Sequence, residues 1–110
     1  MLYVLDDGTI KLTRGDTARI AITINNLLNQ EYSIGKEDSL TLTIKKKVKD
    51  VEPLLQKIVK GTTLFHIKPE DTNNFSFGKY VYDVQLTLSN GDVYTIIEPS
   101  SFIILSEVTC

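Results

Sequence analysis

Apolar and polar side chains alternate with a period of two through most of this chain. The longest alternation lies in residues 80–88, and shorter ones lie in residues 18–24 and 39–45. This pattern places one apolar face on a core and one polar face in water, which is typical of half-buried strands in antiparallel sheets. Because an amphipathic helix needs a period of about 3.6 residues, the pattern argues against helices in most of the chain.

Further short segments extend this pattern to an all-β domain. Candidate strands lie in residues 9–13, 54–60, 64–68, 93–98 and 102–108, and Gly, Pro, Asn or Asp mark the turns between them. A length of 110 residues with 42% apolar residues suits a single domain over residues 1–110. We expect an antiparallel β-sandwich of about seven to nine strands rather than a small barrel. One helical turn is expected in residues 50–56 and another in residues 69–74, capped by Asp71 or Thr72.

The Asn90-Gly91 pair lies between the last two long alternating segments. Both residue types tolerate a positive φ, so the sequence predicts a two-residue type I′ turn. Such a turn fixes the register of a hairpin, and its inward pairs would be Leu88 with Val93, Leu86 with Thr95, and Val84 with Ile97. In this register Asp83 points outward into water, and Gly78 allows an abrupt entry into the first strand.

Side chains that could carry chemistry are few. His66 is the only histidine, and no cysteine or second histidine completes a metal or catalytic site, so we interpret it as a rim residue. Cys110 is the only cysteine, which excludes an internal disulfide and fits synthesis in a reducing cytoplasm. The acidic pairs lack the spacing of a calcium loop, so we expect solvated turn acids at Asp6-Asp7, Glu37-Asp38 and Glu70-Asp71. The sequence therefore predicts no metal, no cofactor and no enzyme.

The charge pattern argues against nucleic-acid and membrane partners. The net charge is −2, the longest apolar runs are too short to span a membrane, and the N-terminus lacks the basic start of a signal peptide. A lysine run could form a phosphate-binding stripe, but we favour a role in protecting a sheet edge from aggregation for Lys45, Lys46, Lys47 and Lys49.

Two loop features offer contacts with other molecules. Arg14-Gly15-Asp16 spells the integrin-binding tripeptide, but a tight turn with Gly15 at positive φ accounts for it and is favoured. Aromatic side chains in predicted loops could form a carbohydrate platform or a protein contact, and the candidates are Tyr3, Tyr32, Phe75 and Phe77. Of these, Tyr32, Phe75 and Phe77 are the predicted interaction residues.

Three segments together carry a family resemblance. They are LTRGDTARIAI in residues 12–22, SLTLTIKK in residues 39–46, and the closing stretch that begins GKYVYDVQLTLSNGD at residue 78. They resemble small immunoglobulin-like modules of bacteriophages and prophages, and the nearest family that can be named is the N-terminal domain of phage baseplate upper proteins. The resemblance runs from Ile10 to Thr109, and the residues that carry it are Gly15, Asp16, Gly78, Tyr80, Tyr82, Asp83 and Gly91.

This resemblance implies an immunoglobulin-like sandwich in which Tyr80 or Tyr82 takes the place of the corner tyrosine. It also implies a non-enzymatic structural or assembly module of a phage tail or baseplate, made in the bacterial cytoplasm and available for incorporation in the virion. None of the motif residues is catalytic, so no active site is inherited. Baseplate upper proteins are longer, with stalk and receptor-binding portions, so a separately encoded accessory protein fits this chain better.

Two functions compete at this point. The first is the structural module, whose expected partners are copies of itself, in a weak homo-oligomer, and phage tail or baseplate proteins. The alternative is a stand-alone β-sandwich that binds carbohydrate or another surface ligand through its loop aromatics. The first predicts a chain that co-purifies with phage particles, and the second predicts glycan binding that depends on Phe75 and Phe77.

Overall fold

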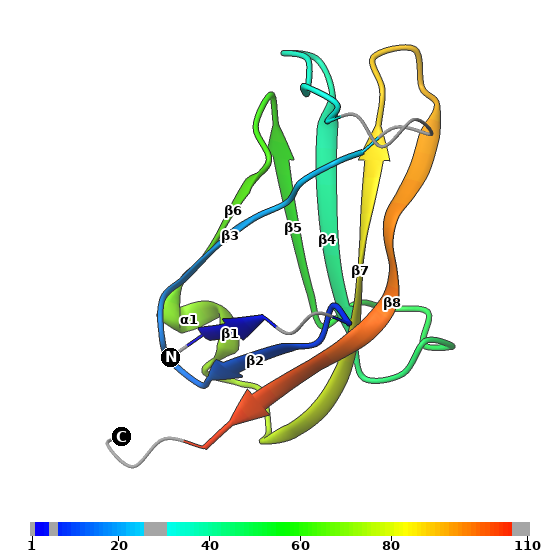
Figure 1. Cartoon of the computed structure of the whole chain (residues 1–110). Coiled ribbons are helices and arrows are strands. Elements are labelled where there is room, and N and C mark those ends of the chain that lie inside the picture. The colour runs from blue at the N-terminus through cyan, green and yellow to red at the C-terminus, as the bar shows by residue number, and fades with distance from the viewer. Residues whose placement is uncertain (1, 5–6, 26–30, 107–110) are drawn as a thin grey trace.

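The part of the chain that the structure describes folds into two β-sheets and one short helix (Figure 1). The computed structural model describes residues 2–4, 7–25 and 31–106. Within these ranges the elements are β1 (Leu2–Val4), β2 (Ile10–Thr13), β3 (Ala18–Ala21), β4 (Ser39–Lys45), β5 (Leu55–Lys60), β6 (Leu64–Ile67), α1 (Pro69–Thr72), β7 (Gly78–Thr87) and β8 (Val93–Leu105). The predicted all-β class is confirmed.

Six strands form the larger sheet in the order β1-β2-β8-β7-β4-β5, and β3 pairs with β6 in a second sheet. Apolar side chains from both sheets form one core cluster, whose fully buried members include Leu42, Phe65, Val84 and Phe102. The alternation in the sequence correctly identifies the core faces, because side chains of β4 alternate between buried and half-buried. The small sheet crosses one face of the larger sheet (Figure 1).

One strand pair is parallel. Ile10 of β2 lies opposite Phe102 of β8, and Thr13 lies opposite Leu105. The other strand pairs among the described residues are antiparallel. The expectation of a purely antiparallel arrangement is therefore wrong at this pair. Alternation reports which face of a strand is buried and carries no information on the direction of its neighbour.

β8 is a single strand of 13 residues, where the sequence predicted two separate strands. Pro99 and two serines interrupt the alternation, and proline is rare inside strands because it has no N–H to donate. The strand stays continuous because the β7–β8 register shifts on both sides of Val84, as at a β-bulge. The helical turn expected in residues 50–56 is also wrong, since β5 begins at Leu55, whereas α1 lies where a turn of helix was expected.

The β7–β8 hairpin has a three-residue loop, so the predicted two-residue type I′ turn is wrong. The Gly91 N–H donates to the Leu88 carbonyl oxygen (2.9 Å), and the Leu88 N–H donates to the Asp92 carbonyl oxygen (2.8 Å). Gly91 has a φ of +94°, as expected for a glycine that follows a type I turn in a loop of this length. The positive φ at Gly91 is thus confirmed, and the turn type is corrected.

The longer loop changes the register next to the turn. Leu86 lies opposite Tyr94 rather than Thr95, and Val93 lies opposite Thr87 rather than Leu88. Farther from the turn, the register shift beside Val84 restores the predicted pairing of Val84 with Ile97. Alternation identified the inward face of β7 but the wrong face of β8 near the turn, because Tyr94, and not Val93 or Thr95, lies opposite the buried Leu86. The irregularities that set the register are not encoded in the alternation.

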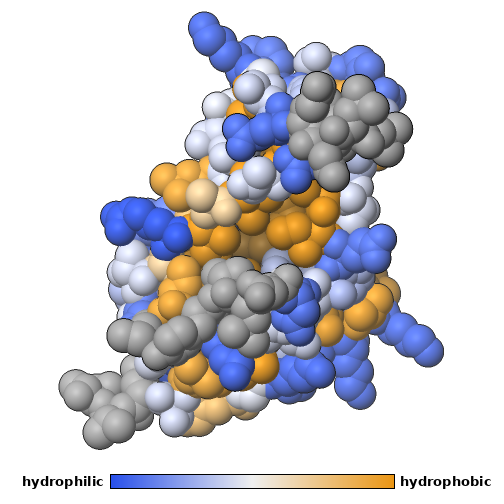
Figure 2. Space-filling view, viewed as in Figure 1, coloured by the Kyte–Doolittle hydropathy of each residue, from blue (hydrophilic) through white to orange (hydrophobic). Residues whose placement is uncertain are grey.

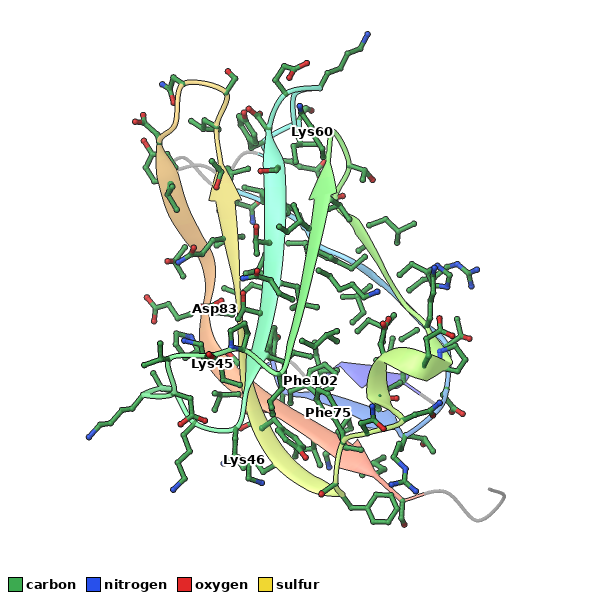
Figure 3. The ribbon with its side chains drawn as sticks, turned by 180° about the vertical axis from the view of Figure 1, so that it is seen from behind. Lys45, Lys46, Lys60, Phe75, Asp83 and Phe102 are labelled. Atoms are coloured by element: carbon green, nitrogen blue, oxygen red, sulfur yellow. The ribbon has the colours of Figure 1, made fainter. Side chains whose placement is uncertain are left out.

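The molecule is elongated, with principal extents of 44 × 27 × 24 Å. We call one end the hairpin end, formed by residues 34–38, 60–63 and 88–93. The opposite end is the loop end, formed by residues 46–54, the start of β7 and the turn at residues 14–16. Lys60 and Lys46 mark these two ends in Figure 3.

Candidate interaction surface

Tyr32 belongs to a hydrogen-bonded clamp at the hairpin end. Its hydroxyl donates to Asp38 Oδ2 (2.6 Å), and the same oxygen accepts the Gly35 N–H (2.9 Å). The other oxygen of Asp38 accepts the Ser89 N–H (3.2 Å), which joins two loops. The hydrogen bond from Tyr32, together with those from the two backbone N–H groups, lowers the pKa of Asp38. Asp38 is buried, so its interpretation as a solvated turn acid is wrong.

Phe75 lies in the core and not on an exposed loop, with 8% of its surface exposed. Its ring packs 5.0 Å from the ring of Tyr80, and the Tyr80 hydroxyl donates to the Ser76 carbonyl oxygen (2.8 Å). The expected role of Phe75 as an exposed contact is therefore wrong. The N–H of Phe75 donates to the Thr72 carbonyl oxygen, so the chain after α1 turns back and directs this ring inward.

Phe77 is exposed at the loop end and lies beneath the side chain of Arg14. The Arg14 guanidinium carbon is 4.3 Å from the centre of the Phe77 ring, a cation–π contact. Arg14 also donates to the Phe75 carbonyl oxygen (3.4 Å), and the Gly15 N–H donates to Thr72 Oγ1 (2.9 Å). The predicted positive φ at Gly15 is confirmed at +84°. The Arg14–Asp16 turn is therefore tied to the segment between α1 and β7.

The three predicted contact aromatics do not form one surface. Tyr32 lies at the hairpin end, Phe77 lies at the loop end, and Phe75 is buried in the core against Tyr80. A carbohydrate platform needs aromatic rings that present their faces side by side to a ligand. Among the described residues, these side chains supply no such arrangement.

Asp83 and Lys45 lie on the outer face of the larger sheet (Figure 3). Asp83 pairs across the strands with Thr43, and both line a small hollow with Lys45, Val48 and Pro99. Burial in this hollow raises the pKa of Asp83, and the nearby Lys45 opposes the rise. Asp83 does point outward, as predicted, but it is half-buried rather than fully solvated.

The lysine run does not protect a sheet edge. β4 has β5 on one side and β7 on the other, and only Lys45 of the run belongs to it. Lys46 lies 4.6 Å from the centre of the Tyr80 ring and donates to the Lys79 carbonyl oxygen (3.4 Å). Lys47 and the rest of the run continue into the exposed loop that leads to β5. The prediction of an edge guard is therefore wrong.

An apolar seam opens between β3 and β8, and sequence reasoning missed it (Figure 2). β8 pairs with β2 only from Phe102 onward, and no described strand pairs with that edge over residues 93–98. One hollow of about 300 Å³ along this seam includes Ile20, Ile22 and Ile97. A second hollow of about 490 Å³ lies at the hairpin end. The seam depends on strand order, which the alternation pattern does not encode.

Of the remaining candidate residues, Asp71 is half-buried and ion-paired, so its interpretation as a solvated turn acid is wrong. His66 is exposed on β6, on the same face as Leu64, as predicted. Asp71 accepts the Lys68 N–H (2.8 Å) and pairs with Lys57 (2.7 Å), so it joins α1 to β5. Burial acts to raise the pKa of Asp71, but these hydrogen bonds outweigh it and the pKa is lowered. Asp6, Cys110 and the side chain of Tyr3 lie outside the described part.

The described residues contain no group of three or more His, Cys, Asp or Glu side chains placed to hold a metal ion. In that same part of the chain, no helix has the length and apolar character needed to cross a bilayer. Comparison of the chain with protein-family models, curated proteins and solved structures found no match. The interpretation of the surface therefore depends on the physical chemistry of its own residues.

Proposed function

We propose that this protein is a non-enzymatic structural or assembly module of a phage or prophage, associated with the tail or baseplate and acting through protein–protein contacts. The motif residues carry the phage resemblance, and the exposed apolar side chains support a docking function. The strongest single observation is Val51, an aliphatic residue on a loop with 92% of its surface exposed. Apolar groups gathered on a surface mark contact sites more often than catalytic ones.

The proposed fold is an immunoglobulin-like sandwich. The chain passes from one sheet to the other between β2 and β3, β3 and β4, β5 and β6, and β6 and β7, as in sandwiches with Greek-key connections. Tyr80 stands near the start of β7 and donates to a backbone carbonyl oxygen four residues upstream, at Ser76. A corner tyrosine makes this kind of bond. Of the two tyrosines considered, Tyr80 therefore suits the role better than Tyr82, whose hydroxyl donates to the distant Gly8 carbonyl oxygen.

The carbohydrate-binding alternative has less support. It relied on Tyr32, Phe75 and Phe77, of which only Phe77 presents much of its ring to solvent. A single ring covered by the Arg14 guanidinium offers little area for a sugar. Protein–protein contacts remain better supported, since exposed apolar residues occur at both ends of the molecule.

Particle purification from an induced host tests the proposal. A tagged copy of this chain is expressed in a strain that carries the prophage, and particles are separated on a density gradient after induction. We expect the chain to sediment with the tail proteins, whereas the same tag on an unrelated β domain stays at the top. A chain that stays at the top and binds a host glycan on an array would contradict the proposal and support the alternative.

A further inference from the structure

The loop between β4 and β5 gathers positive charge at the loop end. We call residues 46–54 the basic loop, and its lysines and those at its base are Lys45, Lys46, Lys47, Lys49 and Lys79. Only Asp50 and Glu52 oppose them within the loop, and the Asp50 carboxylate accepts the Lys47 N–H (3.1 Å). This concentration of lysines contrasts with the net charge of −2 for the whole chain.

The basic loop is also apolar at its surface. Val48, Val51 and Leu54 are all exposed, and each has more than half of its surface in contact with solvent. The loop is held by the bond from the Leu54 N–H to the Ile44 carbonyl oxygen (2.8 Å) and by the turn from Lys47 to Asp50. It therefore presents aliphatic side chains surrounded by lysines. Such a surface is complementary to an apolar groove with acidic residues at its rim.

Such a groove lies at the opposite end of the same molecule. The hollow of about 490 Å³ at the hairpin end, which we call the groove, is lined chiefly by Ile24, Tyr32, Leu86, Leu88, Tyr94 and Ile96. Glu31 forms a β-bridge with Asn25 beside it, and Asp92 accepts a bond from the Tyr94 hydroxyl (3.5 Å) at its rim. None of the described residues that line it is basic.

We propose that copies of this chain associate head to tail, with the basic loop of one copy seated in the groove of the next. The inference rests on the proposed function and deepens it, because it names a second copy as the partner. Lysines would meet Glu31 and Asp92, and Val51 would enter the apolar floor. The two surfaces lie at opposite ends of an elongated molecule, so the contact is heterologous, and each pair of copies leaves one basic loop and one groove free for further copies. A ring or a filament follows from such a contact.

Mixing two variants tests this directly. Val51→Asp places a carboxylate on the basic loop, and Tyr94→Lys places a positive charge in the groove; both side chains are mostly exposed, so the fold is retained. Sedimentation at concentrations up to about 1 mM detects contacts with a Kd near that value. We expect the wild-type mass to rise with concentration and to fall as salt screens the charges. Each variant alone stays monomeric, and a mixture forms one-to-one dimers, because each copy retains the surface that the other lacks.

Ile58→Asp is the matched control, because Ile58 is an exposed aliphatic residue on β5, outside both surfaces. This variant should associate as the wild type does. A wild-type chain that is monomeric at about 1 mM, a single variant that still self-associates, or a mixture that forms no dimer overturns the head-to-tail contact. If the chain nevertheless sediments with tail proteins in the particle experiment, the proposed function stands and only the self-contact is lost.

Discussion

The pKa values of Asp38 and Asp83 are shifted in opposite directions, because the first carboxylate accepts several hydrogen bonds and the second is partly buried. Asp38 accepts hydrogen bonds from Tyr32 and from two backbone N–H groups, and these hold its pKa low. Asp83 occupies a hollow on the outer face of the sheet, where burial raises its pKa and Lys45 compensates only in part. Asp38 therefore stabilises the fold as a carboxylate, whereas Asp83 is easier to accommodate when it is protonated.

Replacing Asp83 with Asn should raise the free energy of unfolding at pH 7 by a small amount. The folded pKa of Asp83 lies above its ordinary value of 3.8, so the folded chain binds the proton more tightly than the unfolded chain does. The free energy of unfolding therefore falls as pH rises from the ordinary value through the folded pKa. The gain from Asp83→Asn should vanish near pH 3, where both states are protonated. Urea titrations at the two pH values measure this difference.

The same urea titrations on Asp38→Asn should show a change in the free energy of unfolding of the opposite sign. The folded pKa of Asp38 is lowered, so its stabilisation is present above the ordinary value and is lost as pH falls through the folded pKa. This variant should be less stable than wild type at pH 7 and approach it in acid. If Asp83→Asn destabilises at pH 7 as Asp38→Asn does, the desolvation account of Asp83 is wrong.

Tyr80→Phe tests the corner tyrosine. The change removes the hydroxyl that donates to the Ser76 carbonyl oxygen and keeps the ring that packs on Phe75. A loss of about 0.5–1.5 kcal/mol in the free energy of unfolding is expected for one such hydrogen bond. Chemical denaturation measures the loss, and Tyr94→Phe is the control because its hydroxyl makes only a long contact to Asp92 (3.5 Å). If both changes lower the free energy of unfolding by the same amount, the Tyr80 hydroxyl does not act as that of a corner tyrosine.

The β7–β8 hairpin depends on one glycine. Gly91 closes its three-residue loop with a φ of +94°, a conformation that β-branched residues resist. A Cβ at this position would meet no atom within 4 Å, so strain in the backbone alone should set the cost of a substitution. The loop sets the register at the hairpin end, and with it the position of Leu88 and Tyr94 in the groove.

Gly91→Val should therefore lower the free energy of unfolding by about 1 kcal/mol or more. The urea midpoint should fall without a change in slope, since the folded structure buries the same surface. Asn90→Ala is the control, because it removes a side chain from the same turn and leaves Gly91 free to keep its positive φ. An unchanged midpoint for Gly91→Val would mean that residue 91 does not hold a positive φ in solution.

At the scale of elements, the sequence predicts most strands and little of their arrangement. Alternation located β4, β5 and β6 to within a residue at each end and β7 to within two, because burial on one face imposes that pattern. It failed at β8, where Pro99 interrupts the pattern and a register shift restores the pairing. It also failed for the parallel pairing of β2 with β8, because direction depends on contacts between segments far apart in the chain.

The candidate surface was harder to predict than the fold. An aromatic residue in a loop has the same sequence appearance whether its ring points inward, as at Phe75, or outward, as at Phe77. Likewise, a lysine run after a strand suggests an edge until the strand order places β4 inside the sheet. Neither the basic loop nor the groove could be predicted as a surface, because only the three-dimensional structure shows which side chains are exposed and that the two lie at opposite ends.

At the scale of the whole molecule, charge and apolar surface are distributed unevenly. The loop end carries lysines with exposed Val48 and Val51. The hairpin end carries Glu31 and Asp92 beside the groove, and its lysines, Lys36 and Lys60, do not line the groove. We expect one loop seated in one hollow to bury less than the roughly 800 Å² per partner of a standard stable interface, so the contact should be weak between two free copies. Many such contacts acting together in a particle would make the association firm.

The number of copies of this chain in each purified phage particle tests the central claim most directly. Quantitative mass spectrometry with isotope-labelled peptides gives the ratio of this chain to each tail protein. A structural module predicts the same whole-number ratio in every preparation, unchanged by repeated washing in the purification buffer. A chain that is absent from the particles, or present in a ratio that varies and falls on washing, would contradict the account.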